Sequence, residues 1–134
     1  MDAPCIFPTL RYQDADAAID WLRNVAGFRE HAVYRDDNGI VMHAEMARGA
    51  SMLMLGTAKD DEYGRLVGDP SAKRTDAIYI AVDDIVPIHA RAVSAGSEIA
   101  QAPYDTAYGS REFACRDPEG NLFSFGTYWP KAAG

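Results

Sequence analysis

An internal repeat limits this chain to folds built from two copies of one structural unit. Three pairs of residues lie 70 positions apart in the sequence. Asp14 and Asp84 each precede a helical pattern, Gly39 and Gly109 lie in turns, and Gly56 and Gly126 each end a strand pattern. The differences 84 − 14, 109 − 39 and 126 − 56 are all 70. Each half shows the pattern of a strand, a helix and three further strands. With 134 residues, the two halves together have the size of one ordinary domain.

Hydrophobic periodicity and turn residues predict the individual elements. In the first half we expect strands at 6–11, 28–35, 40–47 and 51–56, with a helix that begins after Asp14 and ends at Gly27. In the second half we expect strands at 77–82, 98–102, 110–116 and 121–127, with a helix at about 84–95. Residues 57–75 are rich in charge, glycine and proline, and they form either a linker or a mobile cover over a site.

Alternation along each strand predicts an apolar face against the helices and a face of mixed polarity on the other side. The residues expected to pack against helices are Met42, Ala44, Met46, Leu53, Leu55, Ile78, Ile80 and Val82. The residues expected on the opposite face are Val41, His43, Glu45, Met52, Met54, Ala77, Tyr79 and Ala81. A curled sheet would enclose this second face as a pocket with apolar walls and a few polar groups.

Composition excludes two classes of partner. Thirteen basic and twenty acidic residues give a net charge of −7, whereas nucleic-acid binding requires clustered positive charge. No apolar run is long enough to cross a membrane. Cys5 and Cys115 lack metal-binding spacing and are expected to be reduced, buried thiols. The N-terminal stretch is acidic and interrupted by prolines, unlike a signal peptide, so we expect a cytoplasmic protein.

Residues 108–126, YGSREFACRDPEGNLFSFG, resemble the closing segment of glyoxalase/bleomycin-resistance proteins in the vicinal oxygen chelate superfamily. The Asp83-Asp84-Ile85 turn after an apolar strand and the duplicated plan extend this resemblance to the whole chain. The resemblance implies an α+β fold in which two tandem βαβββ modules form a curved mixed sheet around a cleft, with helices on the outer face. It implies one domain over 1–134, with modules at about 4–57 and 76–128 joined by a loop at about 58–75, and usually a homodimer.

The resemblance also indicates where metal-dependent members hold their ion. Those members use a His or Gln and a Glu from each module, and the four positions fall on Phe7, Met54, Ala77 and Ser124. The phenylalanine and alanine side chains have no donor atom. A methionine thioether is soft and a serine hydroxyl is weak for a hard divalent cation. We therefore expect neither a metal ion nor another cofactor at these positions.

His43 and Glu45 are the candidate catalytic residues, because they are neighbours on one face of a strand and combine into an acid/base or ligand pair. Three interpretations of this pair are possible. They form a relocated metal site with a third ligand such as Cys115, or they are a polar anchor for a ligand. Alternatively, Glu45 forms an internal ion pair with Arg11 or Arg111, which alternation places on the same face.

The remaining candidate ligand-binding residues line the same predicted face with soft and aromatic side chains, which suit planar or irregular ligands. Together with Arg11, Arg111, His43 and Glu45, the candidate set contains Phe7, Met52, Met54, Tyr79, Phe113 and Ser124. The competing interpretation is that this face is a core, or is covered by a partner subunit. The charged run 59–64 is either a solvated loop or an acidic lid that attracts a basic ligand.

Three functions are compatible with these observations. The first is a metal-free, dimeric small-molecule binding protein that sequesters an aromatic or cationic, antibiotic-like ligand by stoichiometric binding. The alternative is a lyase, isomerase or dioxygenase with a relocated or metal-independent site that uses His43 and Glu45. The third is a regulatory subunit whose cleft is closed. The sequence contains no hydrolase triad motif and no phosphate-binding glycine loop.

Overall fold

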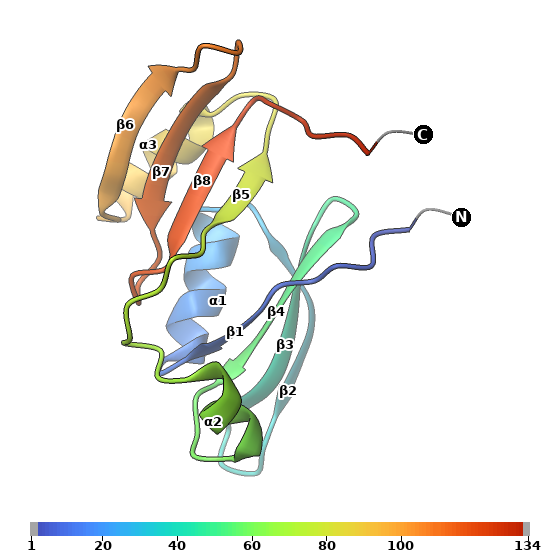
Figure 1. The fold of residues 1–134 in the computed structure, drawn as a ribbon. Helices are drawn as coiled ribbons and strands as arrows, with labels where there is room; N and C mark the ends of the chain where they lie inside the picture. The colour runs from blue at the N-terminus through green and yellow to red at the C-terminus, as the bar shows by residue number, and fades with distance from the viewer. Residues whose placement is uncertain (1–2, 133–134) are drawn as a thin grey trace. The chain divides into compact units, whose positions relative to one another are not determined.

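The computed structural model describes residues 3–132 and divides the chain into two compact units, one ending at Lys73 and the other beginning at Arg74 (Figure 1). The first unit contains β1 (Thr9–Tyr12), α1 (Ala15–Asn24), β2 (Arg29–Arg35), β3 (Val41–Arg48), β4 (Ser51–Thr57) and α2 (Glu62–Val67). The second contains β5 (Ile78–Ala81), α3 (Val86–Ser94), β6 (Ile99–Asp105), β7 (Arg111–Arg116) and β8 (Leu122–Gly126). Within residues 3–132, no helix is long and apolar enough to span a membrane.

Each unit is a βαβββ module with one four-stranded mixed sheet, which confirms the predicted α+β class and the duplication. The strand orders are β1-β4-β3-β2 and β5-β8-β7-β6, and the first pair in each sheet is parallel while the other pairs are antiparallel. The repeat is visible in the register: Leu10 pairs with Leu55, and Ile80 pairs with Phe125. Both partners are displaced by 70 positions (80 − 10 and 125 − 55).

The repeat shifts by one residue in the third strand of the sheet. Ala44 pairs with Leu55 in the first unit, but Phe113 pairs with Phe125 in the second, so the offset between β3 and β7 is 113 − 44 = 69. Between these paired residues the chain is one residue longer in the second unit, since 125 − 113 = 12 and 55 − 44 = 11. A shift of one residue exchanges the two faces of a strand.

Local signals place the helices of the two modules as the sequence predicts. The Asp14 carboxylate accepts a hydrogen bond of 3.0 Å from the Ala17 amide at the start of α1. Gly27 follows the helix with a φ of 81°, a conformation that favours glycine. In the second unit, Asp84 accepts from the Val86 amide at 3.0 Å, so the ordered helix begins two residues later than the expected start.

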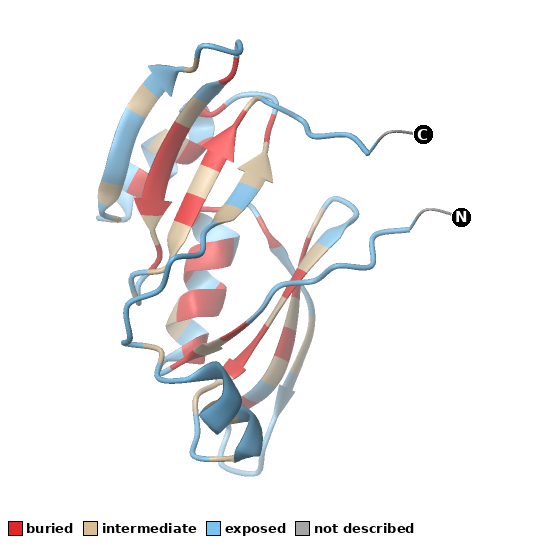
Figure 2. Cartoon of the chain, viewed as in Figure 1, coloured by how far each residue is buried: buried red, intermediate tan, exposed pale blue. Residues whose placement is uncertain are grey.

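The core of each unit lies between its sheet and its helix, as the buried residues in Figure 2 show. In the first unit, Tyr12, Leu22, Met46, Leu53 and Leu55 are at most 2% exposed, and in the second unit Ile85, Phe113, Cys115, Phe123 and Phe125 are at most 1% exposed. Each of the leucine, isoleucine, methionine and phenylalanine side chains among them contributes about 1.5–3 kcal/mol by leaving water.

Two predictions at the start of β3 are wrong. Val41 is 1% exposed and Met42 is 55% exposed, the reverse of the expected alternation. The register between β2 and β3 shifts here, since Tyr34 pairs with His43 but Arg35 pairs with Val41. The resulting β-bulge leaves Met42 unpaired and interrupts the alternation.

The connecting segment contains a helix that the sequence did not predict. The Asp61 carboxylate caps α2 by accepting from the Gly64 amide at 2.7 Å. None of the α2 residues is buried, and Leu66 is 79% exposed. The segment is therefore partly ordered rather than a plain linker.

The two cysteines are both free, but only one is buried as predicted. Cys115 lies in the core of the second unit, where burial raises the pKa of its thiol to about 11. Cys5 is exposed, because the first strand begins only at Thr9 rather than at residue 6. Pro8 lacks the amide donor that a paired strand residue supplies.

Candidate functional site

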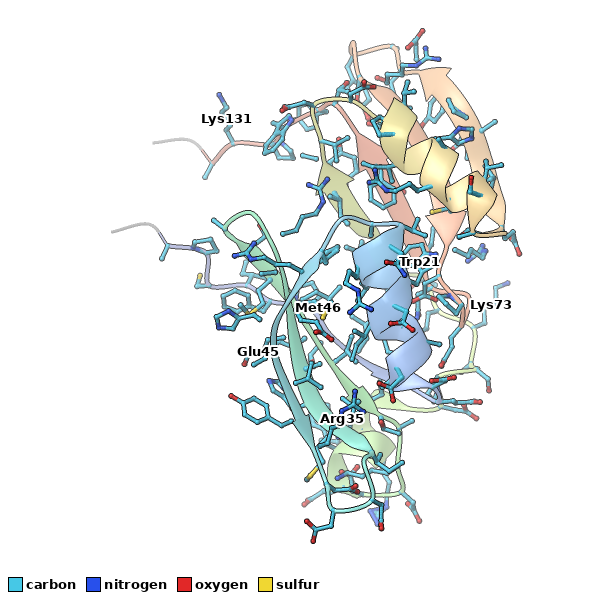
Figure 3. All side chains as sticks on the ribbon, turned by 180° about the vertical axis from the view of Figure 1, so that it is seen from behind. Trp21, Arg35, Glu45, Met46, Lys73 and Lys131 are labelled. Atoms are coloured by element: carbon cyan, nitrogen blue, oxygen red, sulfur yellow. The ribbon has the colours of Figure 1, made fainter. Side chains whose placement is uncertain are left out.

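The first sheet has a polar side that faces away from α1, and we call it the first open face. His43, Glu45, Met52 and Met54 lie on it by register, since Glu45 pairs with Met54 and Ala47 with Met52. Figure 3 shows Glu45 and Met46 on opposite sides of β3. Met46 is fully buried while 28% of the Glu45 side chain is exposed.

His43 and Glu45 form the polar centre of the first open face. The Nε2 atom of His43 is 3.0 Å from Oε2 of Glu45, and His31 Nε2 is 3.9 Å from the other Glu45 oxygen. The ring of Tyr34 stacks on His43 with centroids 6.1 Å apart. Both members of the pair are part-exposed, with 41% and 28% of their side chains accessible. The pair can therefore exchange a proton with a ligand or anchor one by hydrogen bonds.

Arg11 does not pair with Glu45, so this predicted ion pair is wrong. Its guanidinium hydrogen-bonds both carboxylate oxygens of Asp61 at 3.3 and 3.4 Å, and lies 5.1 Å from the centre of the Tyr63 ring. The Gly64 amide, and then Arg11, hold the pKa of Asp61 below its ordinary value. Through these contacts with Asp61 and Tyr63, Arg11 links the N-terminal end of α2 to β1.

The apolar candidates of the first unit are accessible. Met52 and Met54 are half-buried on the first open face, where their thioether side chains can adapt to an irregular ligand. Phe7 precedes β1 and is 38% exposed.

In the second unit, Tyr79 and Ser124 are neighbours by register on the side of the sheet that carries Glu112. We call this side the second open face. The Tyr79 hydroxyl donates a hydrogen bond of 2.7 Å to the Tyr128 carbonyl. Burial is the main reason that the pKa of Tyr79 is raised, so its phenol stays neutral.

Phe113 is a core residue, and its predicted place on the pocket face is wrong. Its ring stacks on Phe125 with centroids 5.3 Å apart and meets the edge of His89 from α3 at 5.1 Å. The one-residue shift of β7 relative to β3 explains the error. Arg111, at the start of β7, forms an ion pair with Asp105 at 3.1 Å and is half exposed.

The candidate residues predicted from the sequence do not include Glu112, a polar group of the second unit whose carboxylate contacts two tyrosine hydroxyls. Tyr108 donates to one carboxylate oxygen at 2.9 Å, and the Tyr104 hydroxyl lies 3.4 Å from the other. The Tyr108 ring packs edge-on against Tyr128 at 5.7 Å. The hydrogen bond to Glu112 is the main cause of the raised pKa of Tyr108.

We call Glu112 with Tyr79, Tyr104, Tyr108 and Tyr128 the tyrosine cluster. Tyr79 belongs to it because its hydroxyl and the Cγ atom of Glu112 both lie directly over Gly126. Only the hairpin register could have predicted the cluster, since it pairs Tyr104 with Glu112.

The residues at the four metal positions implied by the family do not suit a divalent cation. Phe7 and Ala77 offer no donor atom, and Met54 and Ser124 are poor ligands for one. Among residues 3–132, no group of three or more His, Cys, Asp or Glu side chains is placed to hold a metal ion. Cys115, the suggested third ligand for His43 and Glu45, is fully buried in its own unit.

A separate hollow of about 520 Å³ lies beside α2 and includes Arg11 among its lining residues. The basic groups along it already have acidic partners. Arg11 and Lys59 contact Asp61, and Arg65 is 3.8 Å from Asp60. The hollow therefore has no unpaired basic group to attract an anionic ligand, and we take the open faces as the better candidates.

A protein-family model described as "Glyoxalase/Bleomycin resistance protein/Dioxygenase superfamily" matches residues 6–125 of the chain. No curated protein is similar enough in sequence to count as a match. Among solved structures, TioX from Micromonospora sp. ML1 is 26% identical with a TM-score of 0.73, over 97% of this chain and 100% of TioX.

Two more distant structures share the fold. The bleomycin resistance determinant encoded on the transposon Tn5 is 21% identical with a TM-score of 0.65, over 92% of this chain and 96% of that one. TnmS3, described as an antibiotic binding protein from Streptomyces sp. CB03234, is 19% identical with a TM-score of 0.67, over 89% and 90% of the two chains.

Proposed function

The chain belongs to the glyoxalase/bleomycin resistance protein/dioxygenase superfamily, and on this premise we propose that it is a small-molecule binding protein that holds its ligand without a metal ion. One observation supports the proposal most strongly: at the four positions where the family resemblance places metal ligands, this chain has Phe7, Met54, Ala77 and Ser124. The fold is retained while the donor atoms that its metal chemistry needs are replaced by apolar or weakly donating groups.

The side chains on the open faces indicate the class of ligand. Met52 and Met54 are part-exposed in the first unit, and tyrosine rings are exposed in the second. Such groups bind flat, apolar or aromatic surfaces. The net charge of −7 favours cationic over anionic ligands through long-range attraction. We therefore propose an aromatic or cationic, antibiotic-like ligand, a class represented among the structural relatives by the antibiotic binding protein TnmS3.

The proposed mode of action is sequestration, in which one ligand is held per site and released unchanged. We further propose a homodimer in the cytoplasm, formed from single-domain chains with modules at about 4–57 and 76–128. The free, exposed thiol of Cys5 supports a reducing compartment, where such thiols persist.

A ligand panel tests this function. Thermal shift is measured with cationic aromatic antibiotics such as bleomycin, with neutral aromatic compounds and with non-aromatic sugars, and calorimetry then gives the stoichiometry for compounds that stabilise the protein. We expect at least one aromatic or cationic compound to bind. Met54→Ala should weaken its binding, whereas Leu66→Ala on the exposed surface of α2 should not. Failure of every aromatic and cationic compound would contradict the proposal and favour the regulatory subunit.

The 3.0 Å contact between His43 and Glu45 favours a second candidate, an enzyme of the lyase or isomerase type without a metal ion. In that case the pair would transfer a proton to or from the bound compound. His43→Ala would then abolish conversion of a bound compound while thermal stability is preserved. In a sequestering protein, the bound compound is recovered unchanged from the wild type, and the variant loses affinity only.

A further inference from the structure

Glu112 and the tyrosines around it have the chemistry of a site for a small organic cation. Resting on the proposed function, we infer that the tyrosine cluster binds the protonated amine of an aromatic ligand. The amine would donate hydrogen bonds to the Glu112 carboxylate and lie against tyrosine rings.

The Glu112 carboxylate is a partly buried charge without a counter-charge. Within residues 74–132, ion pairs join Arg74 to Asp76, Arg111 to Asp105 and Arg116 to Glu98. None of these pairs includes Glu112, although Glu112 is less exposed than the three carboxylates that form them. Two tyrosine hydroxyls solvate it instead, at 2.9 and 3.4 Å. Neutral donors leave its negative charge in place, and a charge removed from water gains most from a cationic partner.

The aromatic rings supply the second part of a cation site. Tyr79, Tyr104, Tyr108 and Tyr128 are 36%, 38%, 66% and 50% exposed, so the rings remain accessible to a ligand. The negative faces of aromatic rings attract ammonium groups, and arrays of such rings recognise them in other proteins. The phenols contribute no competing charge, because the pKa values of Tyr79 and Tyr108 are raised by burial and by the Glu112 hydrogen bond respectively.

The duplication provides an internal comparison. Tyr34 in β2 corresponds to Tyr104 in β6, and His43 in β3 corresponds to Glu112 in β7 under the 69-residue offset of that strand. In both units, an aromatic residue of one strand is thus paired with an ionisable residue of the next strand at the equivalent position of the hairpin. In the first unit that residue is an imidazole which contacts Glu45 at 3.0 Å. Only the second unit has a carboxylate without an ion-pair partner at this position. The two open faces should therefore differ in the charge of the ligand that they bind.

Gly126 makes the cluster possible. A Cβ atom at this position would lie 2.6 Å from the Tyr79 hydroxyl and 2.7 Å from Cγ of Glu112. Only a glycine lets both side chains lie across β8. Replacing it with alanine changes the geometry of the cluster without changing its charge.

Benzylammonium is the probe for the test, and benzyl alcohol is its neutral control with the same ring. Binding is followed by two-dimensional NMR of the isotope-labelled full-length chain. We expect benzylammonium to shift the signals of Glu112, Gly126 and the four tyrosines, and to bind about tenfold more tightly than benzyl alcohol, as a charge-assisted hydrogen bond implies. Glu112→Gln should remove this preference, and Gly126→Ala should weaken binding.

Glu98→Gln is the matched control, because it removes one negative charge from the same unit at a residue that pairs with Arg116. It should leave benzylammonium binding unchanged. Equal binding of the two probes, an unaffected Glu112→Gln variant, or the absence of any benzylammonium binding would overturn the inference. If the tyrosine cluster fails while a panel compound still binds at Met52 and Met54, the inference is wrong and the proposed function stands.

Discussion

Two glycines at equivalent positions, Gly56 and Gly126, should respond differently to the same substitution. Neither has a positive φ, so alanine is compatible with the backbone at both sites and only space decides the outcome. At Gly56 the new Cβ would lie 2.7 Å from the carbonyl oxygen of Met42. That oxygen belongs to the backbone of the β-bulge and cannot move without displacing β3.

The expected magnitudes follow from what must move. Overpacking against backbone costs about 1–3 kcal/mol, and the lower entropy of the unfolded alanine chain offsets about 0.4–1 kcal/mol. Gly56→Ala should therefore destabilise the protein by about 1–2 kcal/mol. At Gly126 the obstacles are the side chains of Tyr79 and Glu112. Both are partly exposed, so water replaces most of the hydrogen bonds that they give up, and displacing them costs about 1 kcal/mol. The entropy gain nearly cancels this loss, so Gly126→Ala should be close to neutral.

Urea denaturation and thermal unfolding measure the difference. At roughly 4 °C per kcal/mol for a chain of this size, Gly56→Ala should lower Tm by about 4–8 °C, and Gly126→Ala by less than about 2 °C. The Gly126→Ala variant should lose benzylammonium affinity although its fold is intact. Equal destabilisation by the two substitutions, or a neutral Gly56→Ala, would contradict the premise that side chains can move away from a new Cβ atom while the backbone cannot.

Two further predictions concern single groups. The Gly64 amide and Arg11 lower the pKa of Asp61 in the folded protein. The ionised Asp61 side chain therefore stabilises α2 fully above the unfolded pKa of about 3.9. This stabilisation is lost as the pH falls through the lower pKa of the folded state. The protection factor of the Gly64 amide, which corrects for the intrinsic pH dependence of hydrogen exchange, should fall below about pH 4 in the wild type. It should not fall in Asp61→Asn, which retains a capping side chain, and a constant protection factor in the wild type would contradict the role of Asp61. The second prediction is that Ellman's reagent modifies Cys5 rapidly in the native protein and modifies Cys115 only after denaturation, because burial raises the pKa of the Cys115 thiol to about 11. Rapid modification of a Cys5→Ser variant would show that Cys115 is accessible.

The module plan could be predicted from the sequence because its signals are local and occur twice. Asp14 caps a helix, Gly27 ends it, and the apolar residues of the strands alternate over most of their length. The repeat then predicts that the second half contains the same elements in the same order as the first half. The pairing of Leu10 with Leu55 and of Ile80 with Phe125 is the structural form of that sequence repeat.

The errors arise where one residue changes the face of a strand. The bulge at Met42 depends on pairing with β2, and the extra residue between Phe113 and Phe125 moves Phe113 into the core. Neither is visible in hydrophobic periodicity, which continues through both places. For the same reason the tyrosine cluster was missed, because Tyr104 and Glu112 meet only through the hairpin register. The short helix α2 depends on one cap, Asp61, within a charged run.

The most direct test of the central claim is ligand affinity before and after removal of divalent cations. A compound that binds in the panel is titrated calorimetrically into protein as purified, into protein treated with EDTA, and into treated protein supplied with zinc, nickel, manganese or iron(II). We predict the same Kd and stoichiometry in every case. Loss of binding after EDTA treatment, with recovery on addition of one of these metals, would contradict it.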